Sequence, residues 1–124
     1  MRILHLTLAS LCFASAVNCA LASGIEGVWM RDDGNARVRI APCGANMCAT
    51  NLWIRDSSKG EAVGDKLVMS LKKISASKFS GTAYDPKRNL TYAIEVEVGK
   101  DSLHTRGCVL AHILCKSVGW TPAN

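Results

Sequence analysis

The side chains best suited to bind a ligand are aromatic and charged residues spread along the chain. The candidates are Trp29, Trp53, Tyr92, Arg106 and Asp85. An arginine can stack over an indole ring, so Arg106 could join one of the tryptophans, although the alternation of its segment points it outward. Asp85 falls on an inward position, and a buried carboxylate needs a partner, for which Arg106 or Arg55 could serve. The simpler role for Asp85, which we favour, is to cap the turn before Pro86.

No group of residues in the sequence matches a catalytic or metal-binding pattern. There is no G-x-S-x-G elbow, no P-loop and no dinucleotide glycine fingerprint. His104 and His112 lack an H-x-H or HExxH pattern, so we expect no metal site. A hydrolase with paired carboxylates would need a second inward acid, but Glu95 and Glu97 face outward. We therefore expect no enzymatic activity and no cofactor, with an uncharacterised hydrolase as the minor alternative.

The N-terminal segment, residues 1–22, is predicted to be a secretory signal peptide. It has a positive charge at Arg2, a mainly apolar stretch and an A-x-A cleavage site that ends at Ala22. The apolar stretch is shorter than the roughly 20 residues of a transmembrane helix. A lipoprotein anchor at Cys19 is a rival that the preceding asparagine disfavours. We expect a single domain, residues 23–124, that is periplasmic or secreted.

The cysteines that remain after cleavage are even in number, which in an exported domain indicates disulfides. The pairing we favour joins neighbours in the sequence: Cys43 with Cys48, and Cys108 with Cys115. Each of these pairs brackets a short stretch that can close on itself at a hairpin end, although two other pairings exist. A four-thiolate zinc site is the rival, but such sites usually show C-x2-C knuckles. The spacings here are C-x4-C and C-x6-C.

The residues that follow the signal alternate between apolar and polar, which is typical of half-buried strands. The clearest case is residues 90–98, where every second side chain is apolar and the others include two glutamates. The other predicted strands are 25–31, 36–43, 48–55, 66–74, 78–85, 102–110 and 114–121. Short turns rich in Gly, Asn, Asp or Pro separate most of them. Eight such strands in sequence predict an all-β, antiparallel up-and-down barrel, whose closure removes exposed edges.

The outward positions of these strands carry charge, which favours water over lipid as the surroundings. They include Arg37, Arg39, Lys72, Glu95 and Glu97. A membrane barrel would need an apolar outward band with aromatic girdles, so we expect a protein that does not span a membrane. The formal charge of +5 is modest. Nucleic-acid binding would need a basic track with stacking aromatics, so no nucleic-acid partner is expected.

Several short motifs carry a resemblance to known proteins. Gly27-Val28-Trp29 resembles the G-x-W of lipocalin-like barrels. Together with residues 38–48, 79–86, 106–108 and 120–121, it is similar in order and spacing to the bacterial domain-of-unknown-function family numbered 2147. The resemblance implies an exported, lipocalin-like small β-barrel and supplies no catalytic residues.

The chain also departs from the pattern of that family. Ala49 follows the second cysteine of the motif where glycine is usual, and Pro122 stands where an arginine often follows the closing Trp-Thr. The loop after the third strand is shortened to residues 56–65. We therefore do not carry over to this chain any role of that loop as a ligand rim.

Two functions follow from a barrel of this size, because an eight-stranded barrel either fills with side chains or holds one small ligand. The first is binding of a small apolar or amphipathic ligand or envelope component. Its lining would be Val38, Ile40, Leu67, Met69, Leu71, Phe79, Tyr92, Ile94, Val96 and Leu103. Trp29 and Trp120 would either seal a barrel end or form walls of the pocket. The alternative is a packed barrel that serves as an envelope interaction module through Trp53, residues 56–65 and the basic face. The sequence leaves the oligomeric state open.

Overall fold

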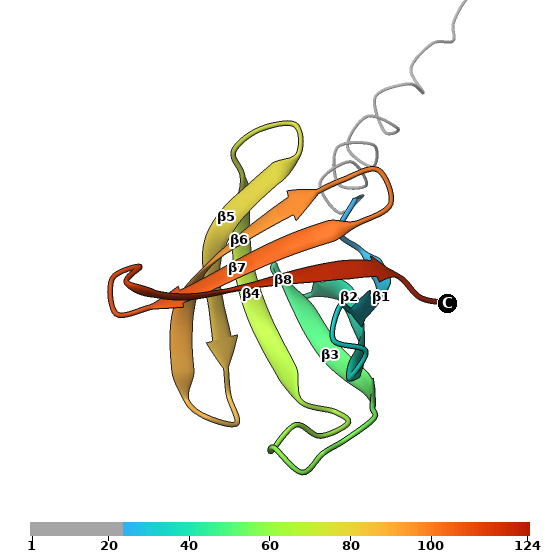
Figure 1. Ribbon diagram of the computed structural model, residues 1–124. Coiled ribbons are helices and arrows are strands. Elements are labelled where there is room, and N and C mark those ends of the chain that lie inside the picture. The colour runs from blue at the N-terminus through green and yellow to red at the C-terminus, as the bar shows by residue number, and fades with distance from the viewer. Residues whose placement is uncertain (1–23) are drawn as a thin grey trace, which may run out of the picture.

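The computed structural model describes residues 24–124, which form one closed barrel of eight antiparallel strands (Figure 1). The strands are β1 (Gly27–Arg31), β2 (Ala36–Cys43), β3 (Asn46–Ile54), β4 (Lys66–Lys73), β5 (Lys78–Asp85), β6 (Leu90–Val98), β7 (Leu103–Val109) and β8 (Leu114–Pro122). Each strand pairs with the next along the chain, and β8 pairs with β1 to close the barrel. The predicted all-β, up-and-down barrel is confirmed. The predicted signal peptide, residues 1–22, lies outside the described residues.

The connection between β2 and β3 is shorter than the sequence pattern indicated. We predicted that the third strand begins at Cys48, but β3 begins at Asn46, which pairs with Cys43. Only Gly44 and Ala45 connect the two strands, and Gly44 has the positive φ of 65° that such a short turn requires. A disulfide between Cys43 and Cys48 spans the hairpin. The turn residue that allows the extra pairing is therefore Gly44.

One end of the barrel, called here the closed end, is filled by apolar side chains. The sequence predicted a strand from residue 25, but β1 begins at Gly27 and Ile25 instead packs into the core, where it is 2% exposed. The backbone carbonyl of Ile25 accepts a hydrogen bond of 3.0 Å from Trp29 Nε1. The other buried side chains of this end are Phe79, Val96 and Leu103. Ile25, which precedes β1, therefore helps to fill the closed end.

The opposite end of the barrel, called here the open end, carries four connections between strands. They are residues 32–35, 55–65, 86–89 and 110–113. Figure 1 shows the β3–β4 loop (residues 55–65) and the β5–β6 turn together at the lower end of the view, with the β7–β8 hairpin projecting to one side. These connections include the longest loop of the described chain. Because loops tolerate changes of sequence and often carry binding residues, the open end is the place to look for a site.

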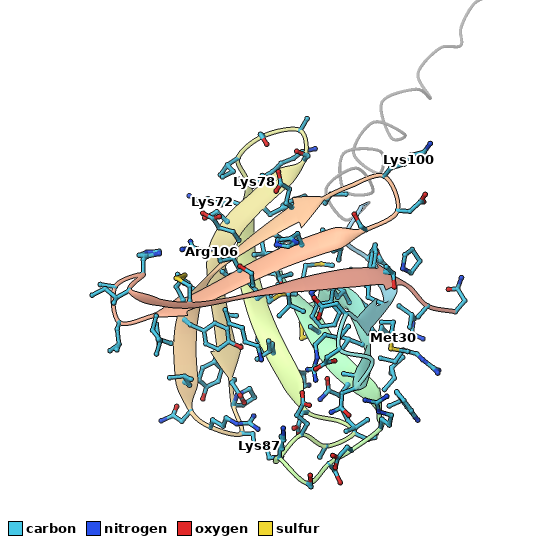
Figure 2. All side chains as sticks on the ribbon, in the orientation of Figure 1. Met30, Lys72, Lys78, Lys87, Lys100 and Arg106 are labelled. Carbon is cyan, nitrogen blue, oxygen red and sulfur yellow. A yellow bond between two sulfur atoms is a disulfide. The ribbon has the colours of Figure 1, made fainter. Side chains whose placement is uncertain are left out.

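The outer surface of the barrel carries the charges that the alternation predicted. Arg39, Lys72, Glu95 and Glu97 are all exposed, and in Figure 2 Lys72 and Arg106 lie on the outside of the strands. Between residues 24 and 124 there is no helix of the length and hydropathy needed to cross a membrane.

Candidate functional site

The open end leads into a cavity of about 790 Å³ inside the barrel. Its inner wall is mostly apolar and includes Val38, Ile40, Ala49, Leu67, Met69, Tyr92, Ile94, Val118 and Trp120. A water molecule occupies about 30 Å³ of liquid, whereas pockets for small ligands measure roughly 300–1,000 Å³. The cavity therefore has the size and the lining of a ligand pocket.

The predicted lining divides between the two ends of the barrel. The residues that line the cavity are Val38, Ile40, Leu67, Met69, Tyr92 and Ile94. The remaining four do not line it: Phe79, Val96 and Leu103 are buried in the core, and the partly buried Leu71 packs against that core. The inward face is thus the one that the alternation predicted, but only part of it borders the cavity.

The β3–β4 loop is held over the open end by Arg31, the last residue of β1. Arg31 Nη1 and Nη2 donate hydrogen bonds of 2.5 and 2.8 Å to the two carboxylate oxygens of Glu61. Arg31 Nε donates to Asp33 Oδ1 at 2.9 Å. Asn35 Nδ2 donates to Glu61 Oε1 at 2.9 Å and to the carbonyl of Asp56 at 3.1 Å. Such paired, charge-assisted contacts fix the orientation of the loop as well as its position.

A second set of contacts joins the same loop to the β5–β6 turn. Lys87 Nζ donates to both carboxylate oxygens of Asp65 at 3.2 Å and to the carbonyl of Gly60 at 3.1 Å. Arg88 Nη2 donates to the same carbonyl at 3.3 Å. Figure 2 shows Lys87 at this turn, beside the loop. The β3–β4 loop is therefore held by contacts with β1 and with the β5–β6 turn.

Asp85, at the end of β5, has a different partner from those we considered. We proposed Arg106 or Arg55, but Arg88 Nη1 donates to Asp85 Oδ2 at 2.8 Å. The backbone N–H groups of Lys87 and Arg88 donate to Asp85 Oδ1 at 3.0 and 3.3 Å. Asp85 therefore caps the turn, as we favoured. The residue is 7% exposed, and its carboxylate has a cationic partner. Arg88 was missed because it lies in the turn itself, only three residues away.

The acidic groups at the open end are held in their charged form. Burial raises the pKa of Asp85, but the hydrogen bonds from the side chain and backbone of Arg88 outweigh it, so that pKa lies below its ordinary value. The hydrogen bond from Arg31 lowers the pKa of Glu61 against a smaller effect of burial. Burial raises the pKa of Tyr92, so its hydroxyl stays neutral at physiological pH. The rim is therefore ionic, and the wall beneath it is neutral.

One cation in the cavity takes no part in these ion pairs. Lys116 of β8 pairs across the sheet with Gly107 of β7, in the same inward row as Val118 and Trp120, and it lines the cavity. It forms no ion pair with any residue in the described part of the chain. Sequence reasoning missed Lys116, although counting back in steps of two from Trp120 would have placed it on the inner face.

The five candidate ligand residues occupy three different places. Tyr92 and Asp85 line the cavity. Trp29 packs in the closed end and is not part of the lining. Trp53 lies on the outside, where the Arg37 guanidinium carbon is 5.6 Å from the centre of its ring. Arg106 is exposed and pairs in register with Glu95 of β6 and Ser117 of β8, away from the cavity. The structure thus brings together only the first two of the five.

The β7–β8 hairpin extends beyond the open end and has an apolar tip. Its ends are joined by the disulfide Cys108–Cys115, and Cys115 lines the cavity. Leu110, Ile113 and Leu114 are 70%, 82% and 62% exposed. Both disulfides join the neighbours in sequence that we favoured. Within residues 24–124, no group of three or more His, Cys, Asp and Glu side chains is arranged to hold a metal ion.

The fold and the site define a small antiparallel up-and-down barrel with an apolar cavity open at one end. A family model described as "Uncharacterized protein conserved in bacteria (DUF2147)" matches residues 27–122, so the chain belongs to this family. The match confirms the resemblance that the sequence motifs indicated. No curated protein and no solved structure gives a significant match to the chain.

Proposed function

We propose that this protein is an exported binding protein that holds a small apolar or amphipathic ligand in its cavity and has no enzymatic activity. The observation that carries the proposal is the cavity of about 790 Å³ with its apolar wall. A ligand that fills the cavity would make packing contacts with this wall and remove its apolar surface from water.

The alternative, a packed barrel that acts as an envelope interaction module, has less support. In that alternative, Trp53, residues 56–65 and the basic face would contact the partner. The ring of Trp53 is partly covered by Arg37, and Glu61 and Asp65 of the loop are engaged with Arg31 and Lys87. These groups are therefore engaged in contacts within the chain, which leaves them less available to a partner.

The two disulfides support an oxidising compartment as the place of action. Together with the predicted signal peptide, they lead us to propose that the protein is periplasmic or secreted. The ligand would then come from the cell envelope or from the medium.

The experiment is a titration with an uncharged, environment-sensitive naphthylamine dye. Ala49→Phe places a ring in the cavity, and Ser117→Phe places the same ring on the exposed outer face of β8 as the matched control. We expect saturable binding with a blue-shifted emission, weakened about tenfold by Ala49→Phe, which corresponds to the burial of one or two methylene groups, and unchanged by Ser117→Phe. Absence of saturable binding, or equal effects of the two variants, would contradict the proposal.

A second measurement looks for the natural ligand. Native mass spectrometry of the protein purified from the envelope or medium of its own host should show an added mass that Ala49→Phe reduces and Ser117→Phe retains. An added mass retained equally by both variants would place the bound molecule outside the cavity.

A further inference from the structure

We propose that the ligand is a single-chain amphipath with an anionic headgroup, and that Lys116 binds this headgroup while the chain lies in the apolar cavity. This inference rests on the proposed function and names the class of ligand. It depends on a difference between the acidic and the basic residues of the cavity.

The acidic residues of the lining are already neutralised by partners within the chain. Glu61 is paired with Arg31, with oxygen–nitrogen distances of 2.5 and 2.8 Å. The other two pairs are Asp65 with Lys87 at 3.2 Å and Asp85 with Arg88 at 2.8 Å. A cationic headgroup would have to compete with these side chains, whose positions are fixed by the fold.

The basic residues of the lining are in excess over these pairs. Arg31 and Arg88 are used in the network, but Lys66 and Lys116 also line the cavity and form no ion pair with residues 24–124. The lining therefore presents two positive charges without an ion-pair partner and no unpaired negative charge among the described residues. The hydrogen bond from Arg31 lowers the pKa of Asp33, and the charge of Lys116 also helps to lower it, but that carboxylate is already engaged by Arg31. An anionic group is the partner that this balance favours.

Of these two lysines, Lys116 is the one placed to meet a headgroup whose chain enters the barrel. It stands in the inward row of β8, above Val118 and then Trp120. Lys66 begins β4 and pairs with Thr50, one position away from the inward pair Ala49 and Leu67. The order along β8 is thus a charge at the rim followed by apolar surface, which matches an amphipath with its head outward.

Gly107 of β7 is the cross-strand partner of Lys116, and its lack of a side chain leaves room next to the lysine. A Cβ atom at this position would lie 3.2 Å from the ring of Tyr92. Because Gly107 has no side chain, the ring and the lysine can both border the cavity. A headgroup at Lys116 would therefore rest beside the neutral hydroxyl-bearing ring of Tyr92, and the chain would continue toward Ile94 and Met69.

The experiment compares dodecanoate with 1-dodecanol, which share a chain and differ in headgroup charge, by displacement of the naphthylamine dye at neutral pH. The variants are Lys116→Gln and, as the control, Lys72→Gln on the exposed outer face of β4. We expect the wild type to prefer dodecanoate about fivefold, the advantage of one partly exposed ion pair. Lys116→Gln should abolish the preference by weakening dodecanoate alone, and Lys72→Gln should leave it intact. Added salt should narrow the preference, because it screens an exposed pair.

The outcomes separate this inference from the proposed function. If both compounds bind the wild type equally, or if Lys116→Gln weakens both to the same extent, the cavity binds apolar chains but Lys116 is not the headgroup contact. If neither compound displaces the dye from the wild type, the proposed function fails, and this inference fails with it.

Discussion

The two ends of the barrel are built from the same eight strands but are held together differently. At the closed end, inward side chains such as Phe79 and Leu103 meet in the middle, and Ile25 packs into the core with them. At the open end, the inward side chains stop short of one another, and ion pairs hold the connecting loops around a cavity. The same inward face of the barrel thus fills the core at the closed end and borders a cavity at the open end.

The two kinds of contact differ in strength. Full burial of a large apolar side chain contributes about 1.5–3 kcal/mol, whereas an exposed ion pair contributes about 0–1 kcal/mol. We therefore expect the closed end to determine global stability and the open end to determine local order and binding.

The largest effect should come from truncation of the closed end. Leu103→Ala should destabilise the fold by about 3 kcal/mol, because it leaves a cavity around a side chain that is 1% exposed. Leu114→Ala, at the 62% exposed rim, should cost less than about 0.5 kcal/mol. Urea unfolding measures both. Similar losses for the two leucines would contradict the division between the ends.

The two disulfides should have similar effects on stability and different effects on binding. Each closes a short loop, so replacing either pair by serines should cost about 2 kcal/mol. Cys115 of one pair lines the cavity, whereas neither Cys43 nor Cys48 of the other does. Only the double serine variant of Cys108 and Cys115 should therefore weaken dye binding, measured under conditions where both variants are folded. A larger loss of binding in the other variant would show that the β7–β8 hairpin does not shape the site.

The ion pair at the open end should control the β3–β4 loop more than the whole fold. Glu61→Gln removes the negative charge that Arg31 contacts. It should lower the free energy needed to open the β3–β4 loop by about 1 kcal/mol. Hydrogen exchange should speed up at the amides of residues 56–65 and stay unchanged in β5 and β6. Glu97→Gln, at an exposed outer position without an ion pair in the described chain, is the control. Faster exchange throughout the barrel would mean that the pair supports the fold globally.

Acid should loosen the open end before it unfolds the barrel. The pKa values of Glu61 and Asp85 are lowered in the folded protein. Their contribution to stability is therefore complete above the unfolded pKa values of about 4 and is lost as the pH falls through the folded ones. The loss should be smaller in Glu61→Gln. Hydrogen exchange of the β3–β4 loop as a function of pH measures the loss of loop stability. A loop that becomes less protected as the pH rises toward neutrality would contradict the predicted direction.

The sequence predicted the parts of the fold that depend on local pattern. Alternation identified the strands and their inward faces, and the short spacing between cysteines indicated the disulfides that the structure contains. Tyr92 was placed correctly on the inner face because alternation in β6 is regular. Asp85 was placed inward for the same reason.

The sequence could not predict which part of the inner face surrounds a cavity. A cavity depends on how far side chains reach across the barrel, and that distance depends on all eight strands together. Trp29 and Tyr92 have the same inward alternation, yet Trp29 packs against Ile25 and Tyr92 borders the cavity. The partner of Asp85 was also missed, because the conformation of a turn decides which of several arginines reaches a carboxylate.

The central claim is that an apolar chain binds within the open half of the barrel. The most direct test is an NMR measurement of nuclear Overhauser effects between bound 1-dodecanol and the methyl groups of the protein. The account predicts contacts to Met69, Ile94 and Val118, which line the cavity, and none to Leu103 or Val96, which fill the closed end. Contacts confined to Leu110 and Ile113 at the exposed hairpin tip, or no contacts at all, would contradict it.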